Sequence, residues 1–140
     1  MDIAALIVWI ITALGGFVLL GRWVQQGGLR QQQAGAPGLP APVVFSHFLL
    51  AAAGLVLWII YVIVDKQVLA WIAFALLVVI ALLGFTLLAR WVPLVRGAPT
   101  TVDAASAERS LPVPVVAAHG LVAVATVVLV LLSALGVGGS

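Results

Sequence analysis

The chain lacks cysteine altogether and has very little charge. Its 140 residues include six basic and four acidic side chains, two histidines and one methionine. The absence of cysteine excludes disulfides, iron–sulfur clusters and thiol chemistry. Four scattered carboxylates offer little to hydrolase or transferase chemistry. Six scattered cations are too few for a nucleic-acid surface, so we expect no nucleic-acid partner.

Hydrophobic residues make up most of the sequence. They account for 65% of it, and the mean hydropathy is +1.34. A soluble domain could not cover its surface with this composition, so the sequence predicts an integral membrane protein surrounded by lipid. A membrane-crossing helix needs about 20 apolar residues. Four runs are long enough, at 3–20, 42–64, 68–88 and 113–135.

All four runs are expected to be helices, because lipid cannot satisfy free backbone groups. The prediction is therefore an all-α membrane protein, with residues 1–140 forming a single membrane domain built as a four-transmembrane-helix bundle. The first run is not expected to be a removable signal peptide, because it lacks a basic leading segment and resembles a later part of the chain. The short turn at 65–67 makes the second and third helices antiparallel neighbours.

The arginines predict the orientation. All five lie on the side of the loops at 24–41 and 91–112, namely Arg22, Arg30, Arg90, Arg96 and Arg109. The positive-inside rule places this side in the cytoplasm and both termini outside. Both loops are rich in small and polar residues without periodicity, so we predict flexible crossovers. Trp23 and Trp91 lie beside arginines and are predicted to be interfacial belt residues.

Two stretches occur twice in the same order. "GFVLLGRWV" at 16–24 matches "GFTLLARWV" at 84–92 at seven of nine positions, and "LPAPVVFSH" at 39–47 matches "LPVPVVAAH" at 111–119 at six of nine. We predict two tandem helix pairs, repeat 1 at 1–64 and repeat 2 at 65–140. Each contributes two spans, which gives parallel-topology repeats about a pseudo-twofold axis along the membrane normal. His47 then faces His119 at the same depth, and Arg22 corresponds to Arg90.

An ionisable residue inside a membrane segment is a functional hypothesis by default. Two imidazoles at one depth form a candidate axial pair for a single haem b, with His47 and His119 as ligands of its iron. Both lie on the arginine side, roughly 7–8 Å beyond the proline that opens each helix.

Small residues share the histidine faces at helical spacing, which leaves room for a flat macrocycle. Arginines at the same membrane face could pair with the two haem propionates. The predicted cofactor-binding set is His47, His119, Arg22, Arg90, Ala51, Gly54, Ala123 and Thr126.

Three other interpretations of the histidines stay open. They could be structural, hydrogen-bonding across helices for about 1 kcal/mol or less. They could hold copper or zinc, although the sequence offers no further nearby ligands. They could serve transport or a proton relay, although no intramembrane acid accompanies them.

In its whole length the chain resembles small four-span membrane proteins of bacteria, which implies the bacterial cytoplasmic membrane. His47 and His119, with Arg22 and Arg90, are similar in arrangement to membrane b-type cytochromes, such as the cytochrome b561 group and the membrane anchors of respiratory dehydrogenases. That resemblance implies a helical bundle holding haem between histidines of different helices. The chain has two histidines where the two-haem members have four, so one bis-histidine haem per chain is expected.

The expected function is electron transfer, with quinol or a partner redox protein, or haem-based redox or gas sensing. A free-standing enzyme is not expected, because bis-histidine ligation leaves iron no open position. The alternative is a non-catalytic accessory or scaffolding subunit of a larger membrane complex. A homo-oligomer, with haem at an interface between two copies, is also compatible with the sequence.

Overall fold

The computed structural model describes residues 1–97 and 106–138 and contains four long helices and two short ones. The helices are α1 (Asp2–Gln25), α2 (Gly28–Gln33), α3 (Ala41–Val64), α4 (Gln67–Arg96), α5 (Ser106–Arg109) and α6 (Val113–Ala134). The four long helices are apolar and long enough to cross a membrane. The predicted all-α membrane protein with a four-helix bundle is therefore confirmed.

Proline and a left-handed turn determine where the long helices begin and end. α3 and α6 follow Pro40 and Pro112, and each has a second proline in its first turn. Proline is tolerated there because those amides have no partner inside the helix. Asp65, at φ 51°, ends α3. The chain then reverses directly into α4, which makes these helices antiparallel neighbours as the short turn predicted.

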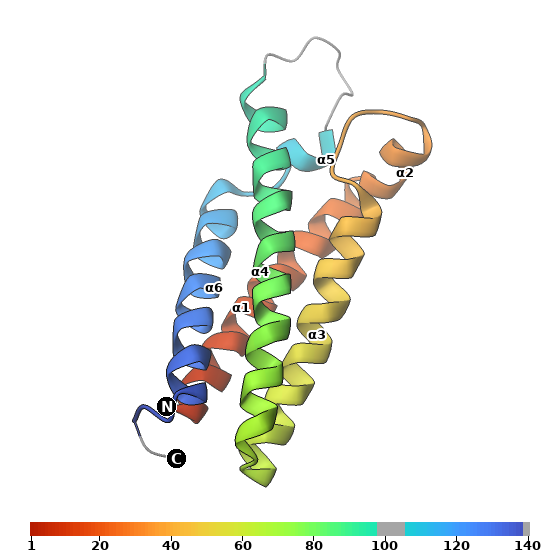
Figure 1. The fold of residues 1–140 in the computed structure, drawn as a ribbon. Helices are drawn as coiled ribbons and strands as arrows, with labels where there is room; N and C mark the ends of the chain where they lie inside the picture. Colours follow the sequence, from red (N-terminus) through yellow and green to blue (C-terminus); the bar gives the residue numbers. More distant parts are fainter. Residues whose placement is uncertain (98–105, 139–140) are drawn as a thin grey trace.

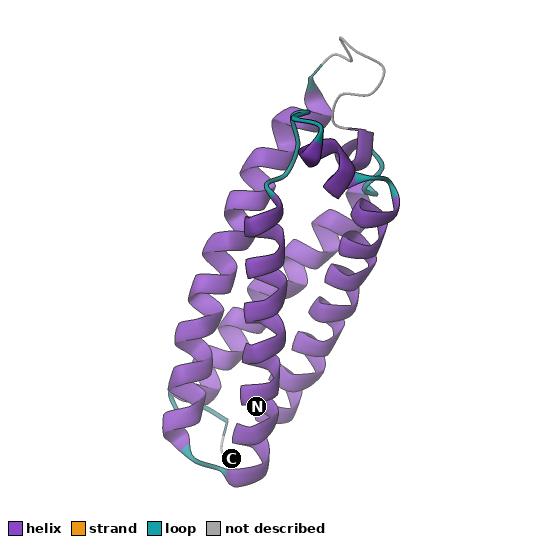
Figure 2. Cartoon of the chain, turned by 90° about the vertical axis from the view of Figure 1, so that its right-hand side faces the viewer, coloured by secondary structure: helices purple, strands orange, loops and turns teal. Residues whose placement is uncertain are grey.

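The helices pack in two closely associated pairs. α1 makes its most extensive contacts with α6, and α3 lies along α4 (Figure 1), while the contacts between these pairs are less extensive. Each close pair joins one helix from 1–64 to one helix from 65–140. The two termini lie at one end of the bundle, and α2 and α5 lie at the other (Figures 1 and 2).

The half of the bundle that contains the start of α1 and the end of α6 has an aromatic core. Trp9 and Trp58 are buried with ring centroids 6.3 Å apart, and Trp58 contacts Tyr61 at 4.7 Å. Alanines at 70 and 73 on α4 are fully buried. Their small side chains leave room for the large rings, so the close packing expected of a protein interior is maintained.

At the arginine end, α2 and α5 form a cap around Glu108, whose side chain is 0% exposed. One carboxylate oxygen accepts hydrogen bonds from the Trp23 indole at 2.8 Å and the Leu39 amide at 2.9 Å. The other oxygen accepts one from the Gln31 amide at 3.0 Å. The Trp91 indole donates to the Glu108 backbone carbonyl at 2.9 Å. A buried carboxylate needs such donors, so the cap is a satisfied polar network.

The cap corrects two sequence predictions. The loops at 24–41 and 91–112 contain α2 and α5 and a defined hydrogen-bond network, so in their described parts they are not structureless crossovers. Trp23 and Trp91 are 2% and 7% exposed, so they are not belt residues at a lipid interface. Their indole N–H groups turn inward because Glu108 offers an acceptor there. Trp23 also lies against Gly28, where a Cβ would overlap the indole ring.

We expect Glu108→Ala to destabilise the protein by about 2–4 kcal/mol, because several buried donors lose their acceptor. Glu108→Gln, which keeps one carbonyl oxygen, should cost less. Thermal unfolding in detergent, followed by tryptophan fluorescence, measures the difference. The control is Asp65→Asn at the opposite end, where the side chain is exposed and Asn accepts a left-handed backbone. Equal midpoints for Glu108→Ala and the control would contradict the role of the cap.

Candidate functional site

The structure brings the two histidines together in the bundle. His47 comes from α3 and His119 from α6, and their ring centroids lie 6.3 Å apart with the planes inclined at 77°. Both side chains are partly buried. Each helix starts at equivalent prolines, so the two imidazoles reach the same level of the bundle from different sides.

Each imidazole is hydrogen-bonded to the backbone of a neighbouring helix. Nδ1 of His47 lies 2.9 Å from the Ile80 carbonyl oxygen on α4, and Nδ1 of His119 lies 2.9 Å from the Thr12 carbonyl oxygen on α1. A carbonyl only accepts, so Nδ1 carries the proton in both rings. Nε2 then holds a lone pair, and within the described residues it has no hydrogen-bond partner.

Glycine allows both contacts. A Cβ at Gly16 would lie 3.1 Å from Cε1 of His119, and a Cβ at Gly84 would lie 3.1 Å from Cε1 of His47. Each glycine follows its acceptor carbonyl by one helical turn, Thr12 in α1 and Ile80 in α4. The absence of a side chain lets each ring approach the facing backbone closely. Positions that match in the repeated sequence therefore make matching contacts.

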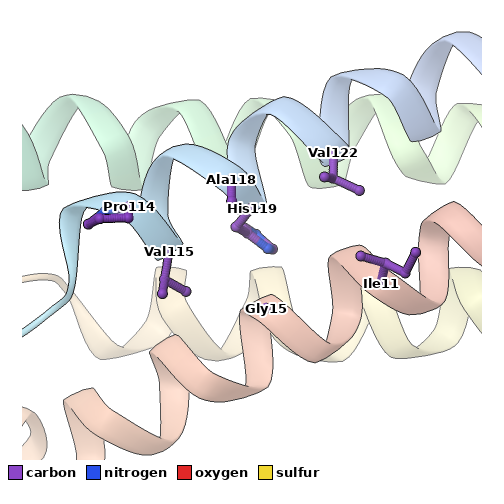
Figure 3. A pocket seen from close by; sticks show the side chains of 7 residues that line it. All are labelled: Ile11, Gly15, Pro114, Val115, Ala118, His119 and Val122. Carbon is purple, nitrogen blue, oxygen red and sulfur yellow. The ribbon is translucent and has the colours of Figure 1, made fainter.

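His119 also borders an open groove between α1 and α6. The groove has a volume of about 340 Å³ and is lined by Gly15, His119 and five apolar residues. Figure 3 shows the His119 ring pointing from α6 toward α1, beside Gly15. His119 is the only polar side chain in this lining, and the open groove connects its imidazole to the outer surface of the bundle.

The small residues predicted beside the histidines differ in their surroundings. Ala51 and Ala123 are half-buried. The space above Gly54 is filled, since a Cβ there would lie 3.0 Å from Trp9 and 3.3 Å from Ile80. Thr126 is buried, donates to its own helix at 2.9 Å and lies 3.0 Å from the Thr12 hydroxyl. Gly54 and Thr126 are thus already in contact with other helices of the bundle.

The two predicted arginines lie nearer the cap than the imidazoles. Nε of Arg22 donates to the Ser110 carbonyl at 2.8 Å, and both Arg22 and Arg90 are exposed. Arg22 follows Gly16 by a little under two turns of α1, or about 9 Å along the axis. The structure does not place either guanidinium against a histidine ring.

Among the described residues, no group of three or more His, Cys, Asp or Glu side chains could hold a metal ion. The donor set at this site therefore consists of two imidazole nitrogens. That number suits a group that brings its own equatorial ligands, and it is too small for a structural zinc site, which takes four.

Comparison with protein-family models, curated proteins and solved structures found no significant match.

The sequence did not reveal the acceptor carbonyls of Thr12 and Ile80. A backbone oxygen carries no residue signature, so only the packed helices identify it. The glycines offered a partial signal, since Gly16 and Gly84 open the two matching stretches at 16–24 and 84–92.

We expect Gly16→Val and Gly84→Val to lower stability relative to Gly21→Val. All three place a β-branched residue in a long helix, but only the first two meet an imidazole; a Cβ at Gly21 meets nothing within 4 Å. Overpacking costs about 1–3 kcal/mol. Thermal unfolding in detergent measures the difference. Equal midpoints for all three variants would show that the imidazoles do not depend on these glycines.

Proposed function

We propose that this protein binds one haem b between His47 and His119 and works as a membrane electron-transfer or redox-sensing protein. One observation carries the proposal: both Nδ1 atoms are committed to backbone carbonyls, which leaves two Nε2 lone pairs in one small region. Histidines that ligate metals commonly donate their other ring N–H to a carbonyl or carboxylate, because this bond fixes the tautomer and orientation.

The separation of the rings supports the same conclusion. An imidazole nitrogen binds a metal at about 2.0–2.1 Å and lies roughly 1.1 Å from its ring centre. Two rings that held one ion between them would therefore have centroids at most roughly 6–6.5 Å apart. The observed separation is 6.3 Å. The 77° between the planes is compatible with this arrangement, because ligation through Nε2 requires no particular angle between the two ring planes.

The donor set fits haem, which supplies one-electron chemistry when bound. The chain contributes two neutral nitrogens of fixed tautomer, oriented by the carbonyls of Thr12 and Ile80. Apolar helices surround the two histidines. Such surroundings limit the access of water to a bound metal group and thereby adjust its redox potential. His47 and His119 would both be ligands of the haem iron and would leave it no position for a substrate, so we propose no stand-alone enzymatic activity.

The rest of the predicted set is proposed with differing support. Ala51 and Ala123 flank the rings and are not fully packed. Gly54 and Thr126 contact other helices, so a macrocycle would have to displace those neighbours. Arg22 on α1 and Arg90 on α4 are the first cations along these helices from the level of the histidines toward the cap. Arg22 would exchange its hydrogen bond to Ser110 for one to a propionate.

The proposed setting is the bacterial cytoplasmic membrane, with the arginine end and its cap in the cytoplasm and both termini outside. The arginine bias supports this orientation. One haem near one face leaves most of the bilayer uncrossed, so electrons would pass to or from quinol or a partner redox protein on that side. A larger complex or a homo-oligomer would supply such a partner.

A structural role is the second candidate, and the same hydrogen bonds favour it. Each imidazole already joins two helices without any cofactor, as polar groups do in membrane bundles. In that case the protein would be a non-catalytic accessory or scaffolding subunit. The two roles differ in what Nε2 does, and that difference can be measured.

The test is the visible spectrum of the purified protein, oxidised and then reduced with dithionite, before and after adding haemin. We expect a Soret band with sharp α and β bands on reduction. His47→Ala and His119→Ala should each abolish the low-spin spectrum or the haem itself. The control is Ser46→Ala, an exposed neighbour of His47, which should leave the spectrum unchanged.

Glutamine separates ligation from structure, because its amide can donate to the carbonyl but does not ligate haem iron as imidazole does. His47→Gln should keep most of the thermal stability and lose the low-spin spectrum. Two results together would overturn haem binding and establish the structural role. The wild-type protein would show no low-spin spectrum after haemin is added, and His47→Gln would keep the thermal stability that His47→Ala loses.

A further inference from the structure

The two halves of the bundle differ on one outer face. Between α4 and α6 lies a groove of about 460 Å³, lined on the α4 side by Phe85, Leu88 and Trp91. On the α6 side Ala117 and Gly120 form its floor. A Cβ at Gly120 would have nothing within 4 Å, so this part of the groove is open.

The matching face of the other half is filled. In the alignment that pairs His47 with His119, Phe45 corresponds to Ala117 and Phe48 to Gly120. The Phe45 ring packs edge-on against Trp23 at 6.5 Å, and the Phe48 ring against Phe17 at 5.3 Å. Two phenyl rings are thus replaced by a methyl group and a hydrogen atom, which opens the groove between α4 and α6.

The groove is suited to hydrocarbon. Its lining offers side chains of carbon and hydrogen, apart from the Trp91 indole, whose N–H is occupied by the Glu108 carbonyl. Phe85 is 58% and Leu121 73% exposed along its edges. Both helices are apolar enough to cross a membrane, so we expect the groove to face lipid. A ligand with a polar ring system would find no hydrogen-bond partner in this groove, whereas the acyl chain of a lipid needs none.

The arginine end of the groove carries positive charge. Arg96 lies on the same helical face as Leu88 and Phe85, about 7–8 Å beyond Trp91 along α4. Arg109 donates to the Gly97 carbonyl at 2.7 Å, which holds its guanidinium beside the end of α4. The guanidinium has further N–H donors to offer. The N-terminus of α6 opens at the same place, since Val113 also lines the groove, and it adds partial positive charge.

We propose that the α4–α6 groove binds one anionic phospholipid, with an acyl chain in the groove and the phosphate group at Arg96 and Arg109. Basic sites at the ends of grooves between membrane helices are a recurring way of holding anionic headgroups. The matching face of 1–64 is closed by its own phenylalanines, so one such lipid binds per chain. The proposal does not depend on haem.

Native mass spectrometry of the protein in detergent tests this, with phosphatidylglycerol and phosphatidylcholine of identical acyl chains as probes. We expect at least tenfold tighter binding of one phosphatidylglycerol molecule. Ala117→Phe with Gly120→Phe, which installs the rings that close the other half, should reduce that binding at least tenfold. Arg96→Gln with Arg109→Gln should remove the preference for the anionic headgroup.

The matched control is Phe45→Ala with Phe48→Gly, which opens the other face while leaving the α4–α6 groove intact. It should leave the tight phosphatidylglycerol site in place. Equal affinity for the two lipids in the wild type would overturn the proposal. A dimer that dissociates when the groove is filled would also overturn it, because a second copy would then be the occupant.

Discussion

The bundle depends on two hydrogen bonds between an imidazole and a helix backbone. Inside a lipid-facing bundle no water is available to share with a buried ring nitrogen, so the carbonyls of Ile80 and Thr12 are required acceptors. Those bonds demand close approach, which explains glycine at 16 and 84. They also join α3 to α4 and α6 to α1, the two most extensively packed helix pairs. The placement of these two glycines and the tautomer of both rings follow from one geometric requirement.

The matching contacts of the two halves end at the cap. Trp23 and Trp91 are equivalent in sequence, but both donate to the same residue, one to the Glu108 carboxylate and the other to its backbone carbonyl. One residue cannot occupy equivalent positions on both sides of a twofold axis. Glu108 therefore joins the two halves asymmetrically. The α4–α6 groove is a second asymmetry, produced by side-chain loss. The imidazole–carbonyl contacts are paired between the two halves, whereas the cap and the α4–α6 groove have no counterpart in the other half.

Sequence reasoning reached the spans because hydrophobic length is a property of composition and needs no partner. It also placed His47 opposite His119, since the repeated stretches identify equivalent positions. It missed Glu108, because one acid in a polar loop has no signature of burial until Trp23 and Leu39 supply donors from distant segments. The sequence placed Trp23 and Trp91 at the membrane interface because arginines lie beside them. That prediction was wrong because both indole N–H groups turn inward to Glu108. Haem binding by the two histidines depends on a cofactor that the chain does not encode, so it stays a prediction.

The pairing of α1 with α6 has a consequence for how the chain assembles in the membrane. Synthesis delivers α1 first and α6 last, so the first helix waits for its main neighbour until the remainder has been made. Until then Gly15 and Gly16 lack the His119 ring that they contact in the complete bundle, and the Thr12 carbonyl lacks its imidazole donor. α3 and α4, joined by a tight turn, can pair at once. Membrane insertion therefore builds the His47 contact as a local hairpin and completes the His119 contact only as its final step.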